Sequence, residues 1–187
     1  MIHFIICDCF LCRWHLFGFV DSYGSKVPSD VLADRVAGYV HYFTLHGALR
    51  PFGVAALLAS YNPETKEHSL HMVEPSGVTY QYFGCAAGKG RQPAKTEMEK
   101  LNLNKPESGE IISVREGVKQ MARIIHALHD EAKDKPFQLE MSWLCEESGW
   151  EHKGVPKDIL NDAVEWAKNA IAEDEDEEES DEEDMEE

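Results

Sequence analysis

The first regular pattern of apolar positions begins at Pro28 and has the period of a helix. Four apolar residues recur at helical spacing between Ser29 and Gly47: Val36, Tyr39, Val40 and Phe43. Ser29 is of the residue type that caps a helix N-terminus, and Pro51 prevents the helix from continuing. The segment is therefore predicted to be an amphipathic helix that leads into a turn.

Three short strands are predicted after this helix. Residues 54–60 are almost wholly apolar, which predicts a strand buried on both faces. Residues 70–74 and 78–83 are separated by Pro75-Ser76-Gly77, which supplies the fixed and the permissive backbone angles of a tight turn.

The spacing of apolar residues then becomes helical and predicts two consecutive helices. The first is marked by Ala94, Met98 and Leu101. The second begins at Ser113, with Glu116 completing a capping box. Its buried stripe is predicted to consist of Val114, Val118, Met121, Ile125 and Leu128.

The last part of the pattern predicts strand and then helix. Residues 137–143 alternate between apolar and polar, as in a strand with one solvated face. A turn at Ser148-Gly149 admits one more short strand, and Pro156 opens a last helix. The apolar face of this helix is Leu160, Ala163, Ala167 and Ala170. This element order predicts an α+β fold, with helices layered on sheet rather than alternating parallel units.

The charge of the chain divides it into a body and a tail. The formal net charge is −17, but residues 173–187 hold 13 carboxylates, which leaves the body with 18 basic and 22 acidic side chains, a net of −4. Such a block of like charge is predicted to be a disordered tail. The tail and the lack of a basic stripe argue against nucleic acid as a partner.

The N-terminal segment is apolar and contains several cysteine and histidine residues. The apolar opening is interrupted by Arg13 and is shorter than the roughly 20 residues of a membrane helix, so no membrane anchor or secretion signal is predicted. Its possible zinc ligands are His3, Cys7, Cys9, Cys12 and His15. They lie in one segment without a distant second pair, so no metal site is predicted. The odd cysteine count of five favours a reducing compartment, the cytosol or nucleus.

Three other groups contain residue types that occur in binding or catalytic sites. The glycine-rich segment Gly84 to Gly90 does not fit a phosphate loop or a dinucleotide fingerprint, so close backbone packing is the preferred reading. Cys85 has no recognisable base nearby in the sequence. One helix end carries a possible ligand group of His126, His129, Asp130 and Glu131. This segment is predicted to be a solvated helix terminus instead. No catalytic, cofactor-binding or metal-binding residue is predicted. Ser180, followed by three acidic residues, is predicted to be phosphorylated.

Several motifs resemble one known family in collinear order from about Tyr23 to the C-terminus. They are Leu32 to Val36, Tyr39 to His41, Arg50-Pro-Phe-Gly53, Pro75 to Gly77, Ala94 to Glu97, His129 to Lys135, Ser142-Trp143 and Val155 to Asp158. These motifs resemble the proteasome alpha-subunit family, and Arg50 to Gly53 is characteristic of its alpha rather than its beta branch. The domain prediction is residues 1–22 as an unmatched segment, 23–172 as the alpha-subunit-like part, and 173–187 as the tail.

The resemblance implies a fold, a location and a set of partners. The fold is the N-terminal nucleophile hydrolase-like sandwich of two antiparallel sheets between helical layers, here lacking its first strands and first helix. The function is that of a structural subunit in the outer alpha ring of the 20S core particle, in cytoplasm and nucleus. Its partners are other alpha and beta subunits, and regulatory caps through the assembled ring. Its role in ubiquitin-dependent degradation belongs to the whole complex.

The resemblance also implies that the chain is not an enzyme. Catalysis in the family belongs to beta subunits, whose threonine nucleophile is freed by cutting a Gly-Thr bond. The threonines of this chain are Thr44, Thr65, Thr79 and Thr96, and none follows a glycine. Family members are longer, and residues 1–18 match none of the gate-forming or cap-binding parts. Two alternatives stay open here: an N-terminal nucleophile hydrolase, and a truncated, non-assembling product with a small Cys/His metal site.

Overall fold

The computed structural model describes residues 27–101, 103, 112–129 and 137–185, with side chains up to Glu173. The elements are α2 (Ser29–Leu45), β1 (Ala56–Asn62), β2 (Glu67–Val73), β3 (Thr79–Gln81), α3 (Arg91–Lys100), α4 (Val114–Ala127), β4 (Ser142–Trp143), β5 (Lys153–Gly154) and α5 (Lys157–Met185). This mixture of helices and antiparallel strands confirms the α+β class for the described chain.

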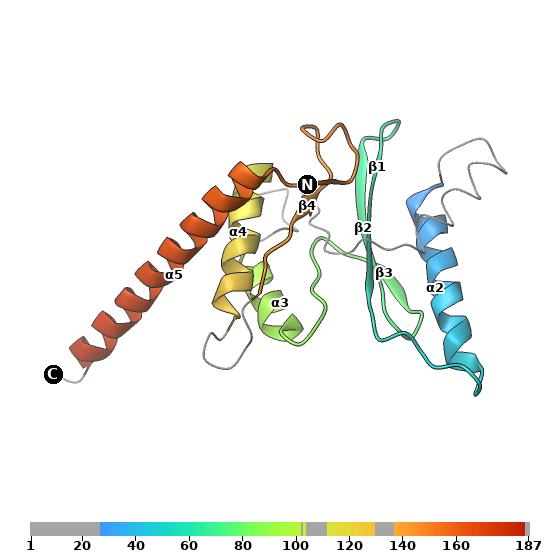
Figure 1. Cartoon of the computed structure of the whole chain (residues 1–187), viewed down its shortest axis with the longest axis horizontal. Helices are drawn as coiled ribbons and strands as arrows, with labels where there is room; N and C mark the ends of the chain where they lie inside the picture. The colour runs from blue at the N-terminus through green and yellow to red at the C-terminus, as the bar shows by residue number, and fades with distance from the viewer. Residues whose placement is uncertain (1–26, 102, 104–111, 130–136, 186–187) are drawn as a thin grey trace.

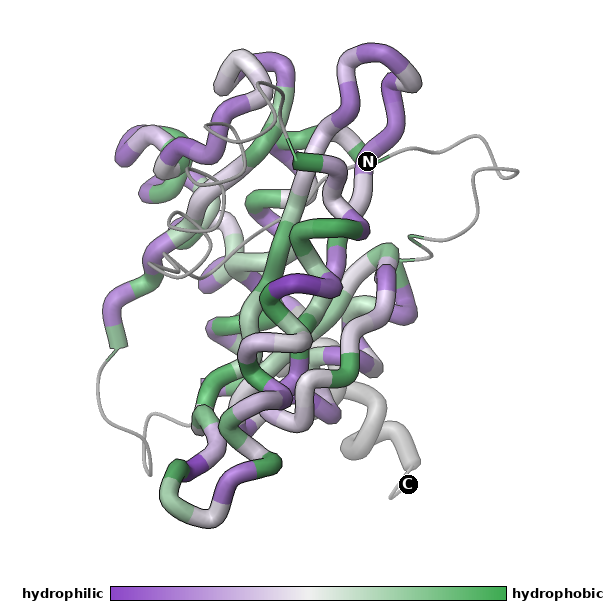
Figure 2. Tube along the Cα trace, turned by 90° about the vertical axis from the view of Figure 1, so that its right-hand side faces the viewer, coloured by the Kyte–Doolittle hydropathy of each residue, from purple (hydrophilic) through white to green (hydrophobic). Residues whose placement is uncertain are grey.

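The elements form layers around a small sheet. β1, β2 and β3 are antiparallel neighbours in that order, and β4 pairs with β5 in a separate two-stranded ladder. α2 lies on one side of the larger sheet, and α3, α4 and α5 lie on the other (Figure 1). Hydrophilic residues concentrate in the loops at the top of Figure 2, whereas the elements below them carry more of the apolar segments.

Two separate apolar clusters stabilise the layers, because apolar faces gain free energy when they leave water. One joins α2 to the larger sheet: Val36, Ala37, Val40, Ala56 and Val73. The other joins α4, α5 and the β4–β5 region: Val118, Ala122, Met141, Trp143, Cys145, Val155, Ala163 and Ala167. The predicted apolar face of the last helix is thereby confirmed at Ala163 and Ala167.

The start of α2 and the burial of β1 differ from their predictions. Pro28, not Ser29, is the N-cap, and no side chain caps this end, because Ser29 is already helical. β1 begins at Ala56, and Ala56 is its only buried residue. Burial on both faces was wrong, because α2 covers one face while the other face is only half covered.

The predicted cap of α4 is confirmed. The Ser113 Oγ accepts a hydrogen bond from the Glu116 backbone N–H at 3.2 Å. Glu116 was also predicted to complete the capping box with its side chain. Its Oε1 instead accepts a hydrogen bond from Gln120 Nε2 at 2.9 Å.

Substituting Ser113→Ala removes this cap and is expected to destabilise the protein. One backbone N–H of the first turn then loses its acceptor, which typically costs about 1 kcal/mol. Urea unfolding of the variant and the parent measures the difference. Ser113→Asp, which can accept the same bond, serves as the control and should retain the parental stability.

The predicted strand 137–143 forms a ladder only at Ser142 and Trp143. Burial still alternates, with Met141 and Trp143 buried and Ser142 half-buried between them. The ladder is short because its partner β5 contributes only two residues, Lys153 and Gly154. The additional short strand before Pro156 is confirmed.

The end of α5 also differs from the expectation. The backbone is helical through Met185, whereas composition predicts disorder from Glu173. Figure 1 shows α5 extending away from the other elements. Glutamate is a good helix former, which favours continuation, while the like charges along this stretch oppose it.

Candidate functional site

The most distinctive surface feature of the described chain is an aromatic cluster at the end of α2. We define it as Tyr39, Tyr42, Phe43, His46 and Phe52. Tyr39 contacts Phe43 with ring centroids 5.1 Å apart, and Tyr42 contacts His46 at 4.3 Å. The two residues of each pair are four positions apart, so the helix places the two rings of a pair on the same face. The turn after the helix returns Phe52 to Phe43, with their ring centroids 4.7 Å apart.

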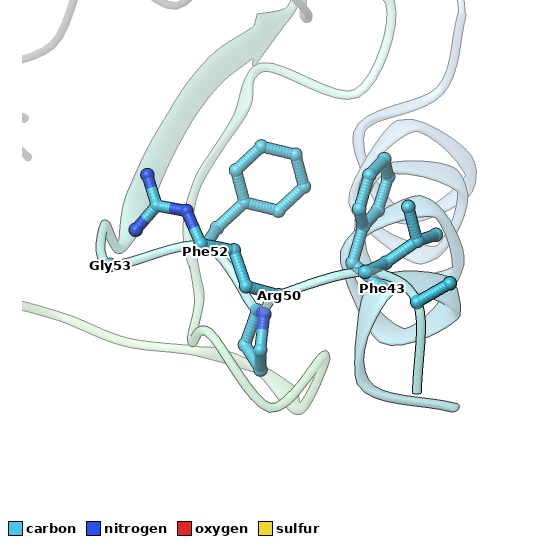
Figure 3. A pocket seen from close by; sticks show the side chains of 7 residues that line it. Phe43, Arg50, Phe52 and Gly53 are labelled. Atoms are coloured by element: carbon cyan, nitrogen blue, oxygen red, sulfur yellow. The ribbon is translucent and has the colours of Figure 1, made fainter. Parts of the chain in front are cut away.

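A shallow pocket of about 330 Å³ lies beside this cluster. It is lined by Phe43, Ala48, Leu49, Arg50, Pro51, Phe52 and Gly53. Figure 3 shows the Phe43 ring coming from the helix and the Phe52 ring from the turn, while the Arg50 guanidinium points away from Phe43. The family motif Arg50 to Gly53 therefore forms the wall of the pocket.

The surroundings of the cluster expose large apolar side chains. Leu45 is 64% exposed, Val54 53% and Tyr42 51%. Large apolar side chains that are exposed beside a pocket are typical of a site that another protein covers. The pocket contains one cation, Arg50, and no acid–base pair or nucleophile, so its chemistry suits docking rather than catalysis.

The segment from Gly84 to Gly90 supports the packing interpretation. A Cβ added at Gly84 would lie 2.9 Å from Leu103 Cδ1, so the neighbouring side chain would have to move. Gly88 has a φ of +112°, a backbone conformation that favours glycine. Within the same segment Cys85 is half-buried, and desolvation raises the pKa of its thiol to about 11. The protonated thiol is a weak nucleophile, which argues against catalysis at Cys85.

The two histidines of the predicted helix terminus pack on a shared aromatic ring. His126 and His129 lie with their ring centroids 5.0 and 4.5 Å from that of Phe137. Asp130 and Glu131, the other two members of that group, fall outside the described residues. Over the residues that are described, no cluster of three histidine, cysteine or acidic side chains could hold a metal ion.

Several other sequence-level candidates cannot be placed. His3, Cys7, Cys9, Cys12 and His15 fall outside the described residues. Ser180 lies within the helical backbone of α5, but its side chain is not described. None of the described helices has the length and apolar character needed to span a membrane.

The threonines occupy structural positions where they are described. Thr44 Oγ1 donates to the His41 carbonyl at 2.7 Å, and Thr96 Oγ1 donates to the Gln92 carbonyl at 3.3 Å. Both are hydrogen bonds within one turn of a helix, as is common for helical threonine. Thr79 lies in β3, and Thr65 lies in the turn between β1 and β2.

Sequence reasoning missed a second aromatic contact, which connects the sheet with the β4–β5 loop. Trp150 stacks on Tyr61 with ring centroids 3.7 Å apart and an interplanar angle of 17°. His68 lies beside both rings, and burial is the main reason that its pKa is lowered. The sequence signal was absent, because Trp150 lies far along the chain from Tyr61 and His68. Trp150 also has an unusual φ of 59°.

Comparison with known proteins identifies the family. The family model described as "Proteasome subunit" matches residues 13–144. Proteasome subunit alpha type-3 of Arabidopsis thaliana is 52% identical over 81% of this chain and 57% of its own length. The Acanthamoeba castellanii protein of the same name is 45% identical over 83% of this chain and 59% of its length.

A third relative, from Saccharomyces cerevisiae, is named probable proteasome subunit alpha type-7. It is 42% identical over 84% of this chain and 54% of its own length. The chain thus spans somewhat more than half the length of these relatives. The alpha-branch resemblance seen in Arg50 to Gly53 and the other motifs is confirmed by these relatives. The chain therefore belongs to the proteasome subunit family, within its alpha branch.

Proposed function

We propose that this chain acts as a non-catalytic structural subunit of the outer alpha ring of the 20S proteasome core particle. The observation that carries the proposal is its 52% identity, over 81% of its residues, to a protein named proteasome subunit alpha type-3. Its partners are then the other alpha and beta subunits, with regulatory caps reached through the assembled ring.

The surface chemistry supports an assembly role. Tyr42, Leu45 and Val54 expose apolar area next to the pocket at Arg50 to Gly53. Such area is stabilised when a neighbouring subunit removes it from water. We therefore expect the aromatic cluster to be covered in the ring.

The proposed role does not require chemistry from this chain. The described pocket has no nucleophile, and none of the four threonines follows a glycine. Ubiquitin-dependent degradation is then a property of the complete particle. The complete fold is proposed to be the N-terminal nucleophile hydrolase sandwich, of which the antiparallel sheet between helical layers is a consistent part. Cytoplasm and nucleus are the proposed locations, with no role for nucleic acid or membrane.

Native gel separation of a tagged full chain from its own cells tests the proposal. Mass spectrometry of the co-migrating proteins should find the other alpha and beta subunits. The double substitution Tyr42→Ser with Leu45→Ser should reduce incorporation, because it removes exposed apolar area without touching a buried side chain. Tyr80→Ser, at a residue 63% exposed on β3, is the matched control outside the cluster. Recovery of the chain only in free, aggregated or chaperone-bound form would contradict the assignment.

Ser180 is proposed to be phosphorylated in the cell. Its acidic neighbours 181–183 match the preference of an acid-directed kinase, and a phosphate adds roughly 1.5 to 2 negative charges. Intact-mass measurement of the chain from cells should show the added phosphate, which Ser180→Ala should remove. A tail mass that is wholly unmodified would count against this site.

A further inference from the structure

Three aromatic rings join the larger sheet to the loop between β4 and β5, residues 144–152. Tyr61 on β1 lies opposite His68 on β2, and their ring centroids are 4.9 Å apart. Trp150 of the loop stacks on Tyr61 at 3.7 Å and lies 5.2 Å from His68. In Figure 1 this loop lies beside β1 at the top of the view. We call Tyr61, His68 and Trp150 the three-ring contact.

The three-ring contact lies on the sheet face that α2 does not cover. Val73 on β2 packs against α2, and His68 is an odd number of positions away on the same strand. Side chains alternate between the two faces of a strand, so His68 points to the opposite face. The contact is therefore independent of the cluster that holds α2, and it links the larger sheet to the β4–β5 region.

The loop holds Trp150 in a strained backbone conformation. Trp150 has a φ of 59°, in the left-handed region that residues with a Cβ seldom adopt. Its N–H donates to the Cys145 carbonyl at 2.9 Å, and the buried Ser148 Oγ donates to the same carbonyl at 2.9 Å. Backbone strain persists only where other contacts offset it. Stacking of the Trp150 ring is therefore part of what keeps the loop in this position.

The surroundings of His68 favour its uncharged form. Burial is the main cause that lowers the pKa of His68 from its ordinary value, and the positive charge of the chain's amino terminus is a smaller cause in the same direction. The groups that contact it from β1 and from the loop are aromatic rings. The loop also holds Glu147 and Glu151, which form ion pairs with Arg115 and Lys153. The remaining titratable neighbours along the chain are Glu67 on β2 and Glu146 and His152 in the loop.

We propose that the three-ring contact is a pH-sensitive connection, in which the uncharged His68 ring holds the loop on the larger sheet and protonation of that ring releases it. A charged imidazole requires hydration, which the packed position restricts. His68 therefore binds a proton more readily when the loop is detached, and acid shifts the equilibrium toward the detached loop. The attachment is complete above about pH 6.5 and weakens as the pH falls below that value, because the pKa of His68 is lowered in the attached state. The proposal concerns contacts within one chain and does not depend on the ring function.

Attraction between a cation and an aromatic face opposes this release. One face of the Trp150 ring is already covered by Tyr61, stacked with an interplanar angle of 17°. This leaves less of the indole face for a protonated His68. The pKa of His68 is lowered, so the loss of hydration on burial is the larger of the two effects.

Fluorine NMR of the purified full chain, labelled with 5-fluorotryptophan, measures the attachment between about pH 8 and pH 5.5. The Trp150 signal is assigned by its absence from the Trp150→Phe variant. In the parent this signal should move as the pH falls, and a soluble gadolinium chelate should broaden it at least about twofold more at the acid end than at the neutral end. His68→Gln should remove the pH dependence. His152→Gln is the matched control, because His152 lies in the same loop but bonds to Ser142 Oγ at 2.8 Å.

The reciprocal experiment measures the pKa of His68 by carbon-13 NMR in the parent and in Trp150→Gly. Glycine adopts a positive φ without strain, so the loop backbone keeps its conformation while the ring is lost. The pKa of His68 should rise toward its ordinary value, because linkage acts in both directions. Circular dichroism checks that each variant is folded, and the Trp150→Gly titration decides the question if His68→Gln does not fold. A Trp150 signal that does not change with pH, the same change in His68→Gln, or a pKa of His68 that falls or stays constant in Trp150→Gly each overturns the proposal.

Discussion

Gly77→Ala is expected to lower the free energy of unfolding by about 2 to 4 kcal/mol, because it combines a backbone penalty with a steric one. Gly77 has a φ of +84°, which a residue with a Cβ adopts only with strain. Its added Cβ would also lie 2.5 Å from His41 Cβ and 2.9 Å from the Ala37 carbonyl oxygen. Both neighbours belong to the α2 backbone or to its first side-chain atom, so neither can rotate away.

Urea unfolding followed by circular dichroism measures this loss, and Gly38→Ala is the matched control. Gly38 lies inside α2, and a Cβ added there meets no atom within 4 Å. Alanine is favoured over glycine in a helix interior by about 1 kcal/mol, so this variant should gain stability. Equal stability of the Gly77→Ala variant and the parent would show that the β2–β3 turn does not press on α2 as described.

The turn at Gly77 shows what local sequence signals predict and what they leave out. Pro75-Ser76-Gly77 predicted a tight turn, and the bond from Gly77 N–H to the Glu74 carbonyl at 2.9 Å confirms it. The contact with α2 was not predictable, because it joins residues more than thirty positions apart. The same contact includes His41 Nδ1, which donates to the Ser76 carbonyl at 3.0 Å.

The aromatic cluster could be predicted only in part. The helical spacing of Tyr39 and Phe43 was visible in the sequence, and so was the turn at Pro51. The spacing places both aromatic residues on the apolar side of an amphipathic helix, and Tyr39 is nevertheless 38% exposed in the structure. The path of the chain after α2, which returns Phe52 to Phe43, depends on tertiary packing and leaves no periodic signal.

The segment 137–143 shows a different limit. Alternation of apolar residues reports which side chains are buried, and this prediction was correct at Met141 and Trp143. Alternation does not report whether a partner strand exists, because pairing needs a second segment of matching length. The sequence therefore overestimated the strand while locating the core residues inside it.

Trp143→Ala is expected to have the largest effect of the single substitutions considered, a loss of about 3 to 5 kcal/mol, because a large buried ring leaves a cavity. Trp143 is 4% exposed and belongs to the cluster that joins α4, α5 and the β4–β5 ladder. Ala163 and Ala167 belong to the same cluster, and small residues at these positions cannot fill the space of an indole. The cavity therefore has little chance to collapse.

Hydrogen exchange and urea unfolding together test this expectation. Trp143 belongs to one of two separate apolar clusters, and α2 packs in the other one with Val36 and Val40. In the Trp143→Ala variant, amide protection should therefore fall most in α4 and α5 and less in α2. Phe137→Ala is the matched control, since Phe137 belongs to the same alternating segment but is 38% exposed. Its loss should be clearly smaller. Equal losses at both positions would mean that the cluster around Trp143 does not stabilise this half of the protein, and that the two helices are instead held by their own contact.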